Sequence, residues 1–401
     1  MKRFLFSLIF CTFALSETIL IPEDYPTIQE GIDASQDGDT VLVAEGTYIE
    51  NLILNKSIVL ASHAIYDDLT NWVEYDDQFT SEWQITNDHI NNTIIDGSSP
   101  ADSVYASVIL ITPDSETCIT PEVMGFTIQN GGGTEVTRTD NEGNEYQERL
   151  GGGILADISD PLIHYNKISN NGSVISTTRF GGGGYFTRVS EDWDYNQENI
   201  RDYNPRCEVQ EFRLPHNYYD GNDAQYGNSV ANRFHEDEFD MSGSIFDVFD
   251  CGNEESAVST IWVKVEPAAS VDYDDGAGQL CAFTAPDVYV DSSIPQECLD
   301  EGCGFSNNPF KTITRALEMI NPTEDNPITI HLSAEEFSPS NNNEVFPIIM
   351  ISNVNLIGQG EEVTILDAEG NEDNPRRVII LENCVNNTIS NATIMGGYKI
   401  T

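Results

Sequence analysis

The sequence contains one order of predicted elements twice, first near its N-terminus and again after residue 300. Each copy begins with apolar residues spaced three or four apart, in PTIQEGIDA (26–34) and in PFKTITRALEMI (309–320). Short runs rich in Val, Ile and Leu follow, bounded by Gly, Asp and Asn. The first spacing is that of one helix face, and the runs are typical of short strands. This order predicts two elongated stacks of strands, each opened by a short capping helix.

A Thr stands near the start of each predicted helix, Thr27 in the first copy and Thr312 in the second. At such a position the hydroxyl accepts a hydrogen bond from the first helical turn. Both residues are therefore candidate N-caps.

Glycine triplets divide the region after the first copy into similar segments. They occur in VMGFTIQNGGG (123–133), GGGILADISDPLIHYNKISNNGS (151–173) and FGGGGYFTR (180–188). Because glycine permits tight corners, each segment is expected to form a coil of short strands and turns. Residues 134–150 interrupt the pattern with polar arms around a turn, which predicts a hairpin that leaves the stack.

Asparagine is expected at the corners of these coils, because its side chain tolerates left-handed backbone and bonds to nearby turn groups. The candidates are Asn170, Asn171, Asn386 and Asn387, and we expect their side chains to form ladders between neighbouring coils. Asn171, Asn386 and Asn391 also begin N-x-S/T sequons, but the corner role is favoured over glycosylation.

Residues 191–284 differ in composition from the segments on either side. They are rich in Asp, Glu, Asn and Tyr, and only 244–251 and 259–267 look like strands. Two strands hold a core only if they find partners, so this segment is either an acidic insert or a small β module. The predicted division is a first unit at 17–190, this middle segment, and a second unit at 285–401 that is cut off after its opening coils.

These segments resemble the right-handed parallel β-helix proteins of the pectin-lyase-like superfamily. The resemblance rests on PTIQEGIDASQDGDTVLVAEGTYIENLILNKSIVL (26–60), on GFTIQNGGG (125–133) and on PLIHYNKISNNG (161–172). Residues 287–317 are similar to an uncharacterised domain that opens other secreted β-helices. The resemblance implies an all-β solenoid fold and leaves the activity open, since one scaffold carries many chemistries.

Residues 1–16 have the layout of a secretory signal peptide. Lys2 and Arg3 precede an apolar run from Phe4 to Leu15, and the run is too short to span a bilayer. The mature chain is therefore expected to be secreted, extracellular or at the cell surface, without a transmembrane segment.

The large excess of acidic over basic residues disfavours some classes of binding partner. The chain has a formal net charge of −49, from 18 basic and 67 acidic residues. Phosphate recognition needs clustered Lys and Arg, so nucleic acid is excluded, and the same repulsion acts less strongly against polyanionic sugars. A polysaccharide or a cell-surface glycan is the partner class that remains.

Cysteine usage fits export. Eight cysteines become seven when Cys11 leaves with the signal peptide, and an odd number leaves at least one without a partner in the chain. Cys298 and Cys303 are close enough in sequence to close a small loop. No spacing matches the CxxC pairs of a zinc site.

The sequence lacks two short motifs of the polygalacturonate hydrolases in that superfamily, Gly-His-Gly and Arg-x-Lys. The adjacent pairs Asp67-Asp68 and Asp76-Asp77 lie in a polar segment that predicts solvated loops. His164 alternates with apolar residues and is expected on the outside of a strand. The favoured function is a carbohydrate-binding or cell-surface protein without a catalytic site, and the alternative is a polysaccharide-degrading lyase or glycoside hydrolase.

The candidate metal site is a calcium site made of Asp192, Asp194, Asn196 and Glu198. Alternating oxygen ligands suit a hard cation, although the glycine at the sixth position and the Glu at the twelfth position of an EF-hand loop are absent. Asp272, Asp274 and Asp275 form a weaker second candidate. An ordinary acidic loop is the alternative in both places, and no other cofactor is expected.

If the first cluster binds calcium, the double change Asp192→Asn and Asp194→Asn removes two charged ligands and abolishes calcium binding by the mature chain. Isothermal titration with calcium chloride measures the effect. A matched pair in a predicted solvated loop, Asp76→Asn with Asp77→Asn, should leave the titration unchanged. Undiminished binding in the first variant contradicts the assignment.

Overall fold

The computed structural model describes residues 16–76, 82–114, 117–139, 145–157, 159–172, 178, 180–186, 211–224, 227–233, 238–246, 261–264, 271–272, 285–296, 303–320, 322, 324–372, 374–381 and 384–398. Within these ranges, strands greatly outnumber helices and most strands pair in parallel. No helix of the described part is long and apolar enough to cross a membrane.

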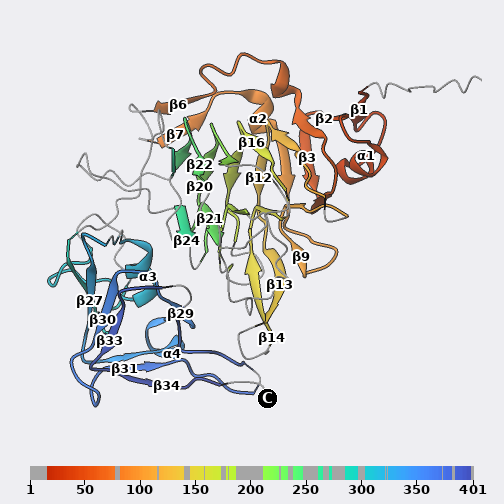
Figure 1. Cartoon of the computed structure of the whole chain (residues 1–401). Coiled ribbons are helices and arrows are strands. Elements are labelled where there is room, and N and C mark those ends of the chain that lie inside the picture. Colours follow the sequence, from red (N-terminus) through yellow and green to blue (C-terminus); the bar gives the residue numbers. More distant parts are fainter. Residues whose placement is uncertain are drawn as a thin grey trace, which may run out of the picture.

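The first unit consists of three parallel sheets, to which successive coils of the chain add one strand each (Figure 1). The eight-stranded sheet A contains β1 (Thr18–Ile21), β2 (Thr40–Val43), β5 (Val59–Ser62), β11 (Glu122–Met124), β16 (Leu162–His164), β19 (Glu211–Arg213), β22 (Glu238–Asp240) and β25 (Val271–Asp272). The six-stranded sheet B contains β3 (Gly46–Ile49), β8 (Thr93–Asp96), β12 (Thr127–Gln129), β17 (Lys167–Ser169), β20 (Tyr218–Asp220) and β23 (Ile245–Phe246). The six-stranded sheet C contains β4 (Leu52–Leu54), β10 (Ile109–Ile111), β15 (Ile154–Ala156), β18 (Gly184–Phe186), β21 (Val230–Arg233) and β24 (Ile261–Lys264). The chain is thus an all-β parallel solenoid in this region.

The strands between 211 and 272 continue these same sheets, which corrects the expectation of an acidic insert or small β module at 191–284. β19 pairs with β16, β20 with β17, and β21 with β18, all in parallel. Only one or two residues of each short strand face inward. Here buried Tyr219 takes the place that Ile168 holds in the preceding coil, and Phe212 and Phe239 are buried side by side. The polar outward positions therefore dominate the composition and conceal the repeat.

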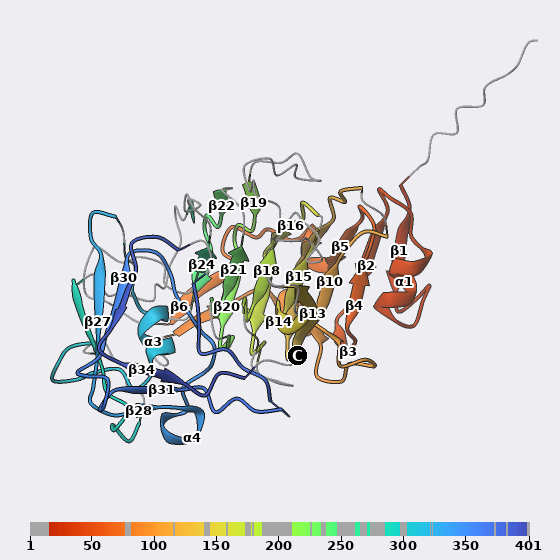
Figure 2. The same cartoon turned by 60° about the horizontal axis from the view of Figure 1, so that its bottom comes forward.

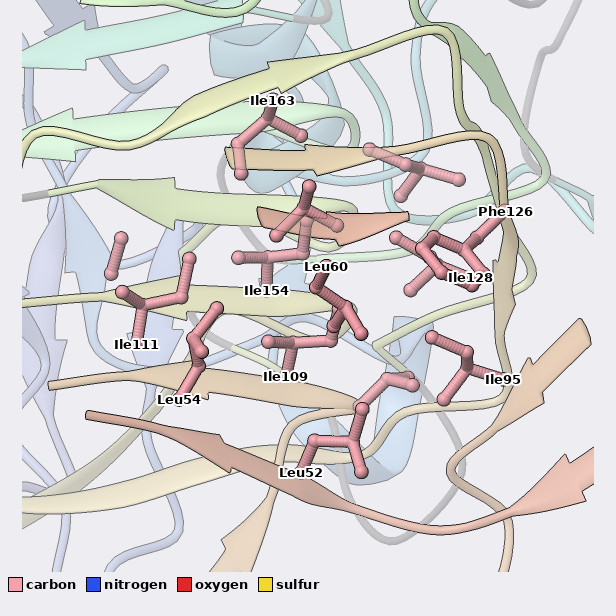
Figure 3. Close-up of a cluster of buried hydrophobic side chains, with 14 of the residues drawn as sticks. Leu52, Leu54, Leu60, Ile95, Ile109, Ile111, Phe126, Ile128, Ile154 and Ile163 are labelled. Atoms are coloured by element: carbon pink, nitrogen blue, oxygen red, sulfur yellow. The ribbon is translucent and has the colours of Figure 1, made fainter. Parts of the chain in front are cut away.

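The core of the first unit is a set of inward columns, one residue from each coil. In sheet B the register aligns Ile95, Ile128, Ile168, Tyr219 and Phe246, and all of these side chains are buried. Figure 3 shows the aliphatic part of this core, where Leu52, Ile109 and Ile154 from sheet C meet Ile95 and Ile128. In later coils the column becomes aromatic, and the rings of Tyr219 and Phe246 stack at 5.1 Å.

Buried asparagine side chains bridge the corners between coils, as the sequence predicts. At the corner between sheets B and C, the Nδ2 of Asn171 donates to the Oδ1 of Asn222 at 2.9 Å, and Gly131 N donates to the Oδ1 of Asn171. The side chain of Asn171 is fully buried. In the second unit, the Nδ2 of Asn386 donates to the Oδ1 of Asn353, and this pair is exposed.

Two excursions leave the first unit. Residues between β5 and β8 form the 3-10 helix η1 (His63–Tyr66), β6 (Val73–Asp76), β7 (Glu82–Ile85) and α2 (Asp88–Asn92), and this excursion packs Trp72 and Ile90 against Tyr218 and Ile245. The predicted hairpin is confirmed as antiparallel β13 (Gly133–Thr139) and β14 (Glu145–Leu150), with β9 (Tyr105–Ala106) beside β13.

The second unit repeats the arrangement on a smaller scale. Its first sheet contains β26 (Asp287–Val290), β27 (Ile328–Leu332), β30 (Val354–Ile357) and β33 (Thr388–Ser390). The other two sheets contain β28 (Glu336–Phe337), β31 (Ile365–Asp367) and β34 (Thr393–Met395), and then β29 (Ile348–Ile349) and β32 (Ile379–Ile380). A short α4 (Pro339–Asn342) follows β28. The strands of these three sheets pair in parallel (Figure 2). They enclose an apolar core of their own.

In both units the first strand, β1 or β26, is followed by a helix, and the two helices are capped in the same way. Thr27 caps α1 (Ile28–Ala34) and Thr312 caps α3 (Ile313–Glu318), each by accepting a hydrogen bond from the third residue beyond it. A carboxylate from a later loop accepts hydrogen bonds from the first two backbone N–H groups of each helix. Glu50 accepts from Ile28 and Gln29 in the first unit, and Glu344 accepts from Ile313 and Thr314 in the second. The predicted N-caps are confirmed. The order of elements is repeated, but a strand precedes the helix in each unit, so the expectation that the helix opens the unit is wrong.

The two capping carboxylates differ in burial, which gives a matched test. Glu344→Ala leaves the N–H groups of Ile313 and Thr314 and the Thr314 hydroxyl without their acceptor in a buried place, at a cost of about 1–3 kcal/mol for each unsatisfied group. Glu50→Ala should cost about 1 kcal/mol or less, because water reaches that half-buried cap. Urea unfolding followed by circular dichroism compares them, and an equal loss in both variants contradicts the argument.

Candidate functional site

A column of left-handed residues forms the corner between sheets A and B. Gly125, Tyr165, His216 and Gly243 occupy equivalent places in successive coils, with φ of 86°, 52°, 54° and 63°. Backbone hydrogen bonds join them along the stack, from Gly125 N to Tyr165 O and from Tyr165 N to His216 O. A Cβ on Gly243 would lie 2.1 Å from Nδ1 of His216, so glycine there leaves room for the imidazole. The column therefore presents two rings between two glycines.

The residues that follow the column hold it in place from inside. The Oδ1 of Asn166 accepts from Phe126 N, the Oδ1 of Asn217 accepts from Asn166 N, and the Oγ of Ser244 accepts from Asn217 N. These side chains are fully buried. Since buried backbone groups need partners, the ladder fixes the corner and with it the direction of the rings.

The two corner rings belong to a group of four. The imidazole of His216 stacks on the ring of Tyr165 at 4.9 Å and 15°, and the ring of His164 lies 5.4 Å from that of Tyr165 at a tilt of 53°. Trp72, from the excursion between β5 and β8, meets Tyr165 edge-on at 5.7 Å. Burial raises the pKa of the Tyr165 hydroxyl. We call His164, Tyr165, His216 and Trp72 the ring cluster.

A charged row lies beside the ring cluster on the outer face of sheet A. The register aligns Glu122, Leu162 and Arg213 in successive coils. Nε2 of His164 lies 3.0 Å from Oε1 of Glu122, and Nη2 of Arg213 lies 3.3 Å from Oδ2 of Asp160. We call Glu122, Asp160, His164 and Arg213 the charged row.

The charged row is partly withdrawn from water. The side chains of His164, Glu122 and Arg213 are 17%, 32% and 34% exposed, and that of Asp160 is 5% exposed. The hydrogen bond with His164 holds the pKa of Glu122 below its usual value, against the opposing effect of burial, and Arg213 adds a smaller favourable charge. Each carboxylate of the row thus has a basic side chain beside it, within a protein of net charge −49.

The arrangement can bind a ligand that has both hydroxyl groups and flat apolar faces. Carboxylate and guanidinium groups accept and donate hydrogen bonds in fixed planes, and the partly exposed rings of Tyr165 and His216 offer aromatic surface next to them, whereas Trp72 is buried against Tyr165. His164 and Glu122 also form a pair that can hold or move a proton.

A second group of titratable side chains lies at the same corner, one coil earlier. The Oδ2 of Asp67 accepts from Asn87 at 2.8 Å and lies 2.7 Å from Nδ1 of His89, while Nε2 of His89 is 3.8 Å from Glu45. The hydrogen bond with His89 lowers the pKa of Asp67. These contacts join α2 to the end of η1 and to the turn after β2, which is a structural role. Within the described residues, no group of His, Cys, Asp and Glu has the geometry of a metal site.

The predicted calcium cluster, Asp192, Asp194, Asn196 and Glu198, lies outside the described residues, as do Asp274 and Asp275. Asp272 is the last residue of β25. Cys118 and Cys303 each take part in a disulfide bond. Cys298 lies outside the described residues.

The structure also shows the positions of other residues singled out in the sequence. His164 is on the outer face of its strand, as expected, but it is paired with Glu122 and mostly covered. Asp67 ends η1 and contacts His89, and is thus part of a structured corner rather than of a solvated loop. Arg376 bonds to Asn374 in an exposed turn.

Sequence reasoning missed Glu122, Arg213 and the pairing of Tyr165 with His216. A signal for the last pair exists, because YNKISNNG (165–172) and HNYYDGND (216–223) place Asn at the same second position, an inward residue at the fourth, and Gly or Asn at the turn. The charged row has no such signal, since it joins residues from three coils.

The comparisons with known proteins bear on the second unit and leave the site unassigned. A family model described as a protein of unknown function (DUF1565) matches residues 299–401, which overlaps the segment 287–317 singled out in the sequence. The search of curated proteins found no match. Among solved structures, the chain is similar to an alginate lyase from Paenibacillus sp. str. FPU-7, with 11% identity, a TM-score of 0.32, and coverage of 95% of this chain and 98% of that chain. A likeness at that TM-score carries no conclusion about fold or activity here.

Removal of the imidazole of His164 should raise the pKa of Glu122 toward its ordinary value, because the hydrogen bond from that ring is the main cause of the lowering. A lowered carboxyl pKa stabilises the fold above the unfolded value, and that stabilisation disappears as the pH falls through the folded pKa. The His164→Leu variant should therefore lose less stability than the wild type over this acidic range. NMR titration of the Glu122 carboxyl and acid unfolding measure the two effects.

The His331→Leu variant is the control, because His331 pairs with Asp287 in the second unit. It should leave the Glu122 titration unchanged. If Glu122 titrates alike in the wild type and in His164→Leu, Arg213 rather than His164 holds the carboxylate.

Proposed function

We propose that the chain is a secreted right-handed parallel β-helix protein of the pectin-lyase-like superfamily that binds a polysaccharide or a cell-surface glycan. The binding surface is the outer face of sheet A, over the charged row and the ring cluster. The observation that carries the proposal is the juxtaposition of the Tyr165 and His216 rings with Glu122, His164 and Arg213 on three neighbouring coils.

The chemistry of this surface suits sugars better than other ligands. A pyranose ring has an apolar face bounded by hydroxyl groups, so it needs aromatic surface and planar hydrogen-bonding groups side by side. The ring cluster supplies the first and the charged row supplies the second. A solenoid also presents these groups along an extended axis, which favours a long chain over a small molecule.

The charge of the protein favours a neutral glycan. With a formal net charge of −49, the surface repels polyanions at long range, and Arg213 is already engaged by Asp160. A neutral polysaccharide is not repelled by the net charge and does not need a free Arg213 to pair with.

A second candidate function is cleavage of the bound polysaccharide. The specific observation in its favour is the contact between His164 and Glu122 next to Arg213, because a base, a carboxylate and a cation on one face are groups that elimination or hydrolysis uses. Cleavage is separated from binding by the appearance of new chain ends.

Affinity electrophoresis of the mature chain in gels that contain xylan, mannan, laminarin, hydroxyethylcellulose, alginate or polygalacturonate tests the proposal. We expect retardation by at least one neutral polymer and weaker or no retardation by the two acidic ones. The His216→Asn variant, in which Asn tolerates the left-handed backbone, should bind at least about tenfold more weakly, a loss of at least about 1.4 kcal/mol.

Tyr105→Ala serves as the control variant, because Tyr105 is an exposed aromatic residue on β9, away from this face. It should bind as the wild type does. A parallel assay for reducing ends and unsaturated products, with and without calcium, decides between binding and cleavage. Migration unaffected by every polymer contradicts the proposed function.

A further inference from the structure

The outer face of the first sheet of the second unit carries a second set of polar and aromatic side chains. The register across β26, β27, β30 and β33 defines two outward rows. One row consists of Asp287, Thr329, Asn355 and Thr388, and the other of Tyr289, His331, Ile357 and Ser390. The residues between them in the first three strands, Val288, Ile330 and Leu356, are at most 1% exposed and face the core. The alternation therefore directs both rows away from the core.

One end of this face is built around a stacked pair. The rings of Tyr289 and His331 lie 5.0 Å apart at 20°, and Nε2 of His331 is 2.6 Å from Oδ1 of Asp287. The side chains of Asp287 and His331 are 56% and 34% exposed. Because the carboxylate orients the imidazole and the imidazole supports the phenol ring, the aromatic surface has a fixed direction.

The rest of the face is neutral. Thr329, Asn355 and Thr388 offer two hydroxyl groups and one amide in a straight row, and adjacent strands of a sheet are about 4.8 Å apart. This spacing is close to that between successive rings of an extended β-1,4-linked glycan. The one carboxylate of the face is paired with His331 in a chain of net charge −49, so the face complements an uncharged ligand.

We propose that this face is a second binding site for a neutral polysaccharide, with the glycan running across the strands so that successive sugars meet successive coils. The inference rests on the proposed function, since it assigns to the second unit the same ligand class as to sheet A of the first. The Tyr289 and His331 rings stack on one sugar, and the row of Thr329, Asn355 and Thr388 bonds to hydroxyl groups along the chain. Figures 1 and 2 both place β27 and β30 at the margin of the molecule, where a long ligand has access.

Two sites on one chain change how the protein holds a polymer. A short oligosaccharide occupies one site at a time, whereas a long chain occupies both and gains effective concentration for the second contact. Loss of either site should therefore weaken polymer binding by about a hundredfold and leave the affinity of the other site for a short oligosaccharide within about twofold.

The experiment uses the full mature chain with cellohexaose as the short probe and hydroxyethylcellulose as the polymer. Calorimetric titration with cellohexaose should give two sites per chain in the wild type, one in Tyr289→Thr and one in His216→Asn. Affinity electrophoresis in hydroxyethylcellulose should show the hundredfold loss for each single variant and no retention of the double variant. Thr keeps the strand preference at position 289, and far-UV circular dichroism confirms the fold of each variant.

The outcomes separate this inference from the proposed function. If Tyr289→Thr matches the wild type in both measurements while His216→Asn loses binding, the second site is refuted and the function on sheet A stands. If Tyr289→Thr loses binding and His216→Asn does not, the second site stands and the assignment to sheet A fails. If the wild type binds neither probe, both are refuted for β-1,4-glucans. The smaller change Asn355→Ala should reduce polymer retention in the same direction as Tyr289→Thr.

Discussion

Stacking of successive coils in register is the constraint on which the rest of this structure depends. A short strand in a parallel sheet has few backbone hydrogen bonds of its own, and nearly all of them go to the coils before and after it. The corners between strands have no ladder of this kind, so their buried polar groups need other partners. Asn166, Asn217 and Asn171 meet that need by donating to carbonyl groups and accepting from backbone N–H groups of adjacent coils. Each corner thus transmits the register of one coil to the next.

The same constraint determines where functional groups lie. Glu122 and Arg213 are far apart in sequence, yet the register brings them into one outward row with Leu162 between them. The left-handed corner before each buried Asn projects one side chain outward, and two of these side chains are the rings of Tyr165 and His216. The excursion that carries Trp72 then packs against the ring of Tyr165. A site of this kind is a property of the stack, because no single coil contains its parts.

The sequence is informative about elements whose cause is local. Thr27 and Thr312, the helix faces behind them and the glycine corners follow from nearby residues, and these parts of the fold could be predicted. The coils after residue 210 were harder, because equivalent corner residues are separated by 40, 51 and 27 positions from Gly125 to Gly243. A repeat of such uneven length is visible only through the corner pattern, in which Asn166 and Asn217 stand one residue after the turn. The charged row depends on the register between coils and on the lengths of the excursions, and neither is written in any one segment.

The two units show which features the stack requires and which it leaves free. Each has, after its first strand, a Thr-capped helix and a carboxylate that returns from a later loop to accept the first two N–H groups of that helix, although Glu344 is buried and Glu50 is not. Burial raises the pKa of Glu344 in spite of its hydrogen bonds, so the second unit retains this carboxyl where its charged form is costly. Glu344 is retained at that cost because the buried N–H groups of Ile313 and Thr314 need an acceptor. The outward rows take no part in the caps or the corners, and they differ between the units: charged on sheet A, and mostly neutral on the sheet of β26, β27, β30 and β33. Any difference in ligand between the two units therefore arises from these outward rows. The shared fold of the two units arises from the caps and corners.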